Sequence, residues 1–520
     1  MKRIVLILTI VLNGSIAFGQ TMFDALKTNE NQIIGTARYS GMAGAFGALG
    51  GDASAIKDNP AGLGIYRKSE VTYTIDALMQ GNNSYWNGQS SKDNSYSIGS
   101  NNLNLILAIP TWKSEVGNTG LLSSNVSFSY NKLKNFNRNL SISSNEVGTS
   151  MTDYFGYFTG NADGDQLEWD NYPQMGYNSA FDNVGLSWIS VMADYGRLIN
   201  PYYDNNGNQI GWESFLSNGE KVIPTYSSIE TGSTDEYSFG WSGNFSNRVF
   251  IGTTLNLQSI SYRVDSKYAE TFGKGGQMTL DNTVITKGKG INLNLGAILV
   301  PLDFLRIGMA IHSPMFFDLR TTSYSTINFN STVNGNLESP TNDRDYVVQS
   351  PLQFNLSAAY IFNKSGLISL EYVQSNYTGM KLMNSNRNSQ EYQADNSDIS
   401  TMLNNSRTIK LGAEYKLTDN FSLRAGFAST NSISNNTANK LMVYNTVRTD
   451  PEFFKHYKTD YLTFGFGYRE ASWYVDFAYV NMFMDEDYYA FNPATFTSGM
   501  QPAKVETTNN NLILTLGLRF

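Results

Sequence analysis

Side chains that could act as a general base are scarce in this sequence. It contains two histidines, His312 and His456, and no cysteine. Neither histidine is followed by the residue types at the spacing that a hydrolase needs around its base. We therefore expect His312 to be a hydrogen-bonded interior residue and His456 to be an exposed loop residue. Because thiol chemistry and cysteine-ligated zinc are also excluded, we predict that the protein is not an enzyme and holds no cofactor.

Two polar segments carry carboxylates that could bind a cation, residues 163–170 and 204–213. A calcium-binding EF-hand loop needs glycine at its sixth position and glutamate at its twelfth. Counted from Asp204, these positions hold Gln209 and Phe215, so the pattern fails. We expect solvated turns, with calcium bridging between loops as the alternative, and we predict no metal ligand.

The composition excludes two further classes of protein. Lys and Arg number 37 against 45 Asp and Glu, a net charge of −8, so the positive field typical of nucleic-acid binding is missing. Charged residues make up 16% of the chain, whereas roughly 25% is usual in soluble proteins. Aromatic residues reach 13%, yet the mean hydropathy is −0.31, which is unlike a helical membrane protein. These values fit a chain in which polar and apolar residues alternate.

The first 19 residues have the anatomy of a secretory signal. Lys2 and Arg3 precede the apolar run 4–12, and small residues lead to a cleavage site after Gly19. Nine apolar residues are too few for a membrane helix, which needs about 20. The sequence therefore predicts an exported protein, and any membrane span must be formed by strands.

Strict alternation is the strongest pattern in the chain. At the C-terminus it places Leu512, Leu516 and Phe520 on one face and Thr515 and Arg519 on the other. Fourteen segments alternate in this way: 71–77, 103–109, 126–130, 237–245, 249–257, 291–299, 307–311, 354–362, 368–372, 409–417, 421–427, 462–468, 473–479 and 512–520. Such segments form either a soluble sandwich or a barrel in lipid.

Three features favour the barrel. The strands are about ten residues long, as a tilted membrane span requires. Aromatic residues such as Tyr468 and Trp473 lie at strand ends, where they suit the membrane interface. The chain also ends on Phe520 within a strand, which we interpret as the signal read by the barrel-assembly machinery. We predict an all-β fold, a transmembrane antiparallel β-barrel of about 14 strands, because closure satisfies every strand edge in lipid.

Long polar stretches separate the strands and are expected on the outer side of the membrane: 80–100, 145–180, 200–233, 265–287, 330–345, 378–406, 430–458 and 484–508. One strand looks interrupted, because the apolar set that includes Leu257 changes parity at Ile260. A one-residue slip would turn every side chain to the other face, so we predict a bulge near Gln258 and Ser259.

Four cations fall on the polar, lumen-facing parity of their strands: Arg263, Lys410, Arg424 and Arg469. Facing lipid at mid-bilayer, such a charge would cost about 2–4 kcal/mol. In the lumen they could bind the carboxylate of an amphiphile. The alternative is that they form lumen ion pairs with residues such as Glu414 and Asp476.

The segment that follows the signal does not alternate and is rich in glycine and alanine. It contains Gly41–Gly47, Gly51–Ser54 and Asn59–Leu63, and its composition predicts a compact plug. These runs resemble the N-terminal hatch of the FadL-type outer-membrane transporters of long-chain fatty acids and aromatic hydrocarbons. Segments 302–314 and 410–427 are similar to later parts of the same family.

The resemblance implies a monomeric barrel of 14 strands with its hatch inside the lumen. Together with the signal anatomy and the alternation, it leads us to assign residues 1–19 to the signal, 20–68 to the hatch or plug segment and 69–520 to the barrel with its long outer loops. The family's Asn-Pro-Ala motif makes Asn59, Pro60, Ala61 and Gly62 the candidate gate. It also implies a kinked strand that opens a lateral hole to the bilayer. The loops are longer and richer in Asn and Ser than this family leads us to expect.

These features together predict a barrel in the outer membrane of a diderm bacterium. Its expected role is passive uptake of hydrophobic or amphipathic small molecules, either fatty acids or aromatic compounds, through a hatch-gated lumen with lateral exit. Its expected partners are outer-membrane lipid, this cargo and the barrel-assembly machinery, with no nucleic acid. The alternative is a structural or accessory subunit of a larger outer-membrane assembly or export complex, bound to other outer-membrane proteins.

Overall fold

The computed structural model describes residues 19–29, 32–111, 119–160, 162–167, 179–362, 365–493 and 501–520 of the chain. Of the predicted signal, residues 1–18 lie outside the described part. None of the helices in the described part is long and apolar enough to cross a membrane.

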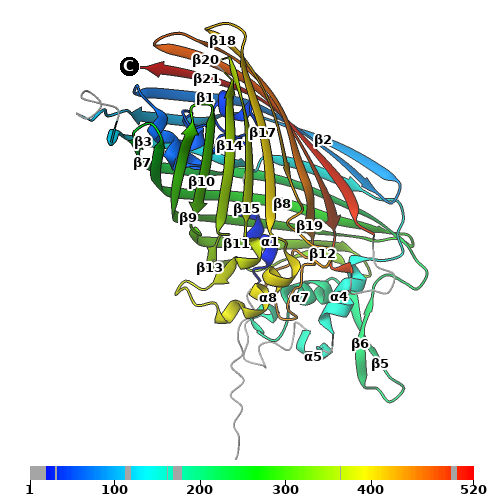
Figure 1. Cartoon of the computed structure of the whole chain (residues 1–520). Coiled ribbons are helices and arrows are strands. Elements are labelled where there is room, and N and C mark those ends of the chain that lie inside the picture. Colours follow the sequence, from blue (N-terminus) through cyan, green and yellow to red (C-terminus); the bar gives the residue numbers. More distant parts are fainter. Residues whose placement is uncertain are drawn as a thin grey trace, which may run out of the picture.

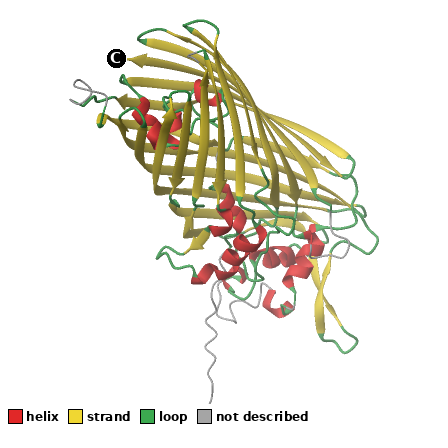
Figure 2. Ribbon diagram, in the orientation of Figure 1, coloured by secondary structure: helices red, strands yellow, loops and turns green. Residues whose placement is uncertain are grey.

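Fourteen antiparallel strands close into a barrel, which confirms the predicted fold class (Figures 1 and 2). In order around the wall they are β1 (Glu70–Trp86), β2 (Gln89–Leu107), β3 (Leu121–Asn135), β7 (Val222–Phe245), β8 (Val249–Phe272), β9 (Gln277–Leu302), β10 (Leu305–His312), β14 (Gln353–Phe362), β15 (Gly366–Ser375), β17 (Ser406–Lys416), β18 (Phe421–Thr430), β19 (Phe453–Arg469), β20 (Trp473–Tyr489) and β21 (Ala503–Arg519). The last strand pairs with the first and closes the ring.

The closing strand shows the predicted alternation. Leu516 and Leu518 are exposed on the outer face, and Ile513 and Thr515 are buried on the inner face. Phe520 is 68% exposed, and its N–H and C=O both pair with Ser69 at 3.1 Å. Outward apolar side chains on neighbouring strands continue this surface around the barrel, and we call it the apolar belt.

Several strands rise beyond the belt, and their two faces exchange polarity there. On β8, Leu255 and Leu257 point outward, whereas Ile260 is 2% exposed and points inward. The register of β8 with β7 and with β9 is continuous throughout, so the predicted bulge at Gln258–Ser259 is wrong. The apolar residues change face because the outer side of the strand passes from lipid into water, while its inner side begins to cover a core.

That core belongs to a cap over one mouth of the barrel, at the end that carries most of the helices, and we call this end the outer mouth (Figure 2). Helices α4 (Met151–Thr159) and α7 (Trp188–Tyr195) pack there on the extended strands. The other elements at this end are α5 (Gly164–Leu167), η4 (Ala180–Asp182), η5 (Tyr377–Gly379), η6 (Gln390–Tyr392), α8 (Gln393–Met402) and strands β4 (Arg138–Ser143), β11 (Phe316–Asn330), β12 (Asn334–Glu338), β13 (Asn342–Gln349) and β16 (Lys381–Met383). The hairpin of β5 (Ile199–Tyr203) and β6 (Gln209–Ser214) projects away from the barrel (Figure 1).

The N-terminal residues lie inside the barrel. Helix α1 (Met22–Lys27) is followed by a buried segment with α2 (Ala37–Ser40), η1 (Ser54–Lys57) and η2 (Pro60–Ile65), which we call the hatch segment, residues 32–66. Its backbone contacts the inner wall where the strands carry glycine. A Cβ at Gly252 would overlap the carbonyl of Pro60, and one at Gly426 would overlap the backbone of Met42. Glycine in the wall therefore permits this close approach.

Candidate functional site

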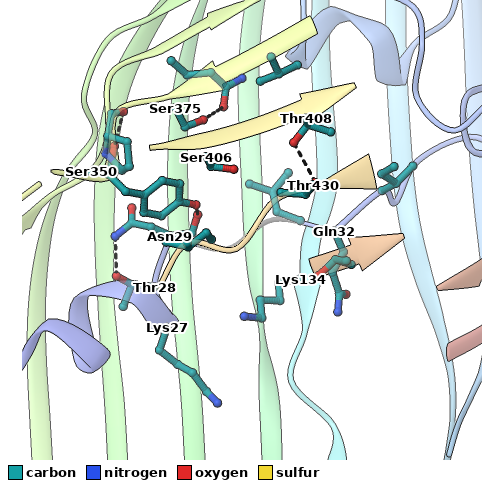
Figure 3. Close-up of a pocket in the computed structure, with 18 of the residues that line it drawn as sticks. Lys27, Thr28, Asn29, Gln32, Lys134, Ser350, Ser375, Ser406, Thr408 and Thr430 are labelled. Carbon is teal, nitrogen blue, oxygen red and sulfur yellow. Dashed lines mark hydrogen bonds between the residues drawn. The ribbon is translucent and has the colours of Figure 1, made fainter. Parts of the chain in front are cut away.

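A chamber of about 310 Å³ lies in the lumen next to the hatch segment. Figure 3 shows Lys27, Asn29 and Gln32 of the N-terminal segment and the wall residues Thr408 and Thr430 around this chamber. The two threonine hydroxyls are 2.9 Å apart, and Asn29 accepts a hydrogen bond from the hydroxyl of Tyr377 at 2.9 Å through its carbonyl. Amide and hydroxyl side chains line this chamber together with apolar ones such as Met315 and Phe317, so the chamber is amphipathic.

A second cavity of about 120 Å³ lies between α1, strands β7 to β9 and the segment 440–454, and we call it the outer pocket. Its walls are largely aromatic and aliphatic: Phe136, Tyr226, Ile260, Tyr262, Val264 and Phe454. The inward-facing apolar residues of β8 beyond the belt form one side of it. Lys27, Thr28, Phe136 and Glu230 line both the outer pocket and the chamber, so the two cavities adjoin.

The cations of the outer pocket are all paired with carboxylates. Lys27 Nζ lies 2.6 Å from Glu230 Oε2. Arg448 and Lys440 lie 2.6 and 2.9 Å from Asp450. Burial alone would raise the pKa of Asp450, but these two cations hold it below its usual range.

Glu452 accepts a hydrogen bond from Ser266 Oγ at 2.8 Å. Burial, together with the neighbouring charge of Asp450, raises the pKa of Glu452. The polar groups of this pocket therefore include a carboxyl that favours its neutral form more than an exposed glutamate does.

The barrel wall is interrupted on one side of the chamber, between β2 and β3. Their pairing ends at Asn102 and Asn131. The register of β1 with β2 shifts beside Asn101, and that of β3 with β7 shifts at Leu133. Beyond these irregularities, β4 continues along β7, whereas no paired neighbour lies on this edge of β2 among the described residues. We call this interruption the seam.

Side chains bridge the seam where backbone pairing is missing. Asn135 Nδ2 donates to Ser97 Oγ at 3.0 Å, and further along Ser141 N–H donates to Asp93 Oδ2 at 2.6 Å. Asn135 also lines the chamber, so the seam separates the chamber from the outside of the barrel. Tyr96 and Ile98 flank it on the outer face with 74% and 87% exposure, so the seam lies against the apolar belt.

The four cations predicted to face the lumen have different positions. Arg263 is on the outer face above the belt, 2.7 Å from Asp265, so its predicted lumen position is wrong. Arg263 lies in the part of β8 beyond the belt, where the outward face of the strand is in contact with water and carries the polar side chains. Arg469 is half-buried and lies 4.7 Å over the ring of Tyr474.

Lys410 and Arg424 are buried on the inner face and form ion pairs, the alternative that the sequence left open. Lys410 Nζ lies 3.0 Å from Glu371 and 3.3 Å from Asp58 of the hatch segment. Arg424 lies 2.6 Å from both Glu414 and Asp476. Arg38 of the hatch segment joins the same cluster, 2.8 Å from Glu414. Lys410 and Arg38 thus connect the hatch segment to the wall, whereas Arg424 links wall residues to one another.

The predicted gate residues are fixed in place. Asn59 is 2% exposed, and its Oδ1 accepts from Ala61 N–H at 3.1 Å, which caps η2. Its Nδ2 donates to the carbonyl of Gly47 at 2.6 Å and to that of Ala297 at 3.2 Å. Pro60 begins η2, and Gly62 packs against Gly50. A gating role for Asn59–Gly62 stays a prediction.

The histidines have hydrogen-bonding partners. His312 Nε2 lies 2.9 Å from the carbonyl of Asp58, and its Nδ1 lies 3.2 Å from Gln353 Nε2. His456 lies within β19 rather than in an exposed loop, 2.9 Å from Glu486, so its predicted position is wrong. Because the segment 453–469 forms one long strand, the inner face of the barrel takes up this residue.

The carboxylates considered as calcium ligands either form hydrogen bonds within turns or lie outside the described residues. Asp204 Oδ1 accepts from the backbone of Asn206 and Asn208 at 2.8 Å each. Residues 168–170 lie outside the described part. Within the described part, no group of three or more His, Asp or Glu is placed to hold a metal ion.

The position of the seam was not predicted, although the sequence carries a signal for it. On β2, Leu103 and Leu105 point outward at odd positions, while Tyr96 and Ile98 point outward at even positions. This change of parity marks the irregularity beside Asn101. On β8 the same kind of change reflects water on the outer face, so parity alone does not distinguish the two causes.

No protein-family model and no curated protein matches the sequence. Solved structures match its fold. A Pseudomonas aeruginosa FadL homologue aligns with a TM-score of 0.51 and 12% identity over 95% of this chain and 100% of that chain. The P. putida toluene transporter TodX aligns with a TM-score of 0.50 and 10% identity over 94% and 99%. A TodX deltaS2S3 mutant, a monoaromatic hydrocarbon channel, gives 0.51 and 12% over the same shares. The chain therefore has the FadL-type barrel fold, which the resemblance implied.

Proposed function

We propose that this barrel sits in the outer membrane of a diderm bacterium and mediates passive uptake of hydrophobic small molecules. The observation that carries the proposal is the adjacency of three features: an apolar outer pocket, a chamber that shares four lining residues with it, and a seam beside that chamber. Cargo would enter the outer pocket under the cap, pass α1 into the chamber and leave sideways into the bilayer.

The outer pocket favours a small, uncharged cargo. Its volume of about 120 Å³ is comparable to an apolar protein cavity of roughly 150 Å³ that holds benzene, and it is small for a long acyl chain. A fatty-acid carboxylate would have to compete with Asp450 or Glu230, since the cations lining the described pocket already pair with them. We therefore place single-ring aromatic compounds ahead of fatty acids.

Lateral exit avoids a second passage through water. The seam borders the apolar belt, and side-chain hydrogen bonds such as Asn135 to Ser97 bridge it, so no backbone ladder between β2 and β4 has to break among the described residues for it to open. The route downward is blocked by the hatch segment, which two ion pairs join to β17 and a hydrogen bond from Gly47 N–H to Glu371 joins to β15. We propose cleavage of the signal after Gly19 and insertion through the barrel-assembly machinery, which would read Phe520.

A disulfide across the seam tests this route, and the absence of native cysteine makes it specific. In the variant Ser97→Cys/Asn135→Cys, the two side chains already in contact at 3.0 Å are joined. Uptake of radiolabelled toluene by cells should fall strongly under oxidising conditions and recover with reductant, because the seam can no longer separate.

The matched control is Thr322→Cys/Asp343→Cys, which joins two hydrogen-bonded side chains on paired strands of the cap that line neither cavity. This crosslink should leave uptake unchanged. If the seam crosslink forms fully and uptake continues at the wild-type rate, lateral exit at this seam is wrong.

A role as an accessory subunit of a larger assembly is the second candidate. It is favoured by the cap over the outer mouth and by the projecting β5–β6 hairpin, where Tyr202 and Tyr203 are 41% and 57% exposed. Gentle solubilisation separates the two proposals. A stoichiometric outer-membrane partner that is lost when residues 200–213 are replaced by a short turn would support the subunit role, and a lone barrel would contradict it.

A further inference from the structure

A groove of about 280 Å³ lies on the outer wall of the barrel across β1, β2 and β21. Gly81 of β1 is at its middle, between Asn94 of β2 and Thr508 of β21. A Cβ placed on Gly81 would meet Asn94 Oδ1 at 3.4 Å, so there is room for a side chain that the sequence does not supply. The missing side chain hollows the wall at this point.

The groove is at the rim of the apolar belt. Two residues below Gly81 along β1, Met79 lies between Tyr96 and Asn510. Two residues further, the row is apolar, with Ala77 between Ile98 and Leu512. Two residues above Gly81 the row is polar and charged, with Asn83 between Lys92 and Glu506. This order, from hydrocarbon contact to charge, is that of the boundary between acyl chains and head groups.

Most of the polar side chains that line this groove have unused hydrogen-bonding groups. Among the described residues, no hydrogen bond or ion pair involves the side chains of Asn83, Lys92, Asn94, Tyr96 or Thr508. Lys92 is the one charged residue among the described residues that line the groove, and Glu506 lies just outside this lining, on the far side of Asn83. One cation, two amides and two hydroxyls thus face a common space.

We propose that this groove binds the phosphorylated sugar head group of a lipid in the outer leaflet. Lys92 would bind the phosphate, and the amides of Asn83 and Asn94 would bind sugar hydroxyls. The acyl chains would continue down the belt over Met79 and Ile98. The groove opens to the outside of the wall, so this ligand is separate from the cargo of the lumen.

A lipid bound in this groove would contact the strand that forms one edge of the seam. Lys92, Asn94 and Tyr96 lie on β2, whose other edge forms the seam. A head group held by β1, β2 and β21 together would brace the β1–β2 hairpin against the last strand. This consequence rests on the proposed function, whereas binding of the lipid does not.

Native mass spectrometry of the intact barrel in detergent tests the site. The probes are lipid A, an acylated glucosamine disaccharide with two phosphates, and the same lipid after removal of its phosphates. We expect wild-type protein to retain one lipid A tightly and to bind the dephosphorylated lipid about tenfold more weakly, since a charge-assisted contact is lost. Lys92→Ala should weaken lipid A binding by a similar factor, and Gly81→Val should abolish the tight site by filling the groove.

The matched control is Lys267→Ala, an exposed outward lysine on β8 far from the groove in the sheet order, which should bind lipid A as wild type does. If Gly81→Val does not fold, Gly81→Ala and Lys92→Ala still decide the question. Equal lipid A binding by wild type and Lys92→Ala would overturn the proposal. Displacement of lipid A by excess inorganic phosphate would also overturn it, because the site would then recognise a free anion.

Discussion

Replacing Asn59 should loosen the hatch segment without disturbing the barrel. In Asn59→Ala, the carbonyls of Gly47 and Ala297 and the N–H of Ala61 each lose a hydrogen bond in a buried place. Each such bond contributes about 1 kcal/mol net, so the three together contribute roughly 3 kcal/mol to docking. Since 1.4 kcal/mol corresponds to about a factor of ten, the opening equilibrium of η2 should rise about a hundredfold.

Hydrogen–deuterium exchange in detergent measures this directly. Peptides covering residues 41–66 should lose about two orders of magnitude in protection, while the paired residues of β1 and β21 keep theirs. Asn386→Ala, in an exposed turn of the cap, is the matched control and should change neither region. If protection of the hatch segment falls less than threefold in Asn59→Ala, the docking energy assigned to this side chain is wrong. Toluene uptake by cells carrying Asn59→Ala tests the gate itself, and we expect it to change while the barrel assembles normally.

Three further predictions concern other parts of the chain. Deleting Phe520 removes two backbone hydrogen bonds to Ser69 and an exposed ring, so heat-modifiable, folded barrel in membranes should decrease, and normal insertion would contradict this. Burial, with the nearby charge of Asp398, raises the pKa of Asp395 in α8 to about 7. Between about pH 4 and 7 the folded state therefore binds a proton that the unfolded state has lost, so the hydrogen-exchange protection factors of α8 should fall as the pH rises from about 4 to 7. A flat profile in the wild type, or an unchanged slope in Asp395→Asn, would refute the assignment. Arg263→Ala should leave uptake at the wild-type rate, because this side chain lies in water on the outer face, and a marked loss would restore a lumen role.

The barrel could be predicted from the sequence because lipid imposes one rule on every strand. Alternation at Leu512–Phe520 and in the other spans reports which side faces hydrocarbon, and closure then follows from the cost of unpaired edges. The same rule failed at Arg263, where the strand continues into water and its inner side covers a core. Sequence parity identifies a change of environment but does not name the environment.

The candidate site was less accessible to prediction for a related reason. The outer pocket combines Ile260 and Tyr262 of one strand with Arg448 and Asp450 from a distant polar stretch, and no local pattern links them. The ion pairs of Lys410 and Arg424 were foreseeable as an alternative, since acidic residues share their parity. Their connection to Asp58 and Arg38 required knowledge of where the hatch segment docks.

The contacts of the hatch segment bear on the order of events during biogenesis. The backbone N–H of Ala37 donates to Thr515 on the last strand, at 2.7 Å, while the carbonyl of Met42 is in reach of the glycines of β17 and β18. An early part of the chain thus carries a binding surface for strands that are synthesised last. If the strands assemble around this segment, it would hold the last strand beside the first before the barrel closes. The segment would therefore act as a template for ring closure before it acts as a barrier. Loosening it should slow ring closure as well as change what crosses the finished barrel.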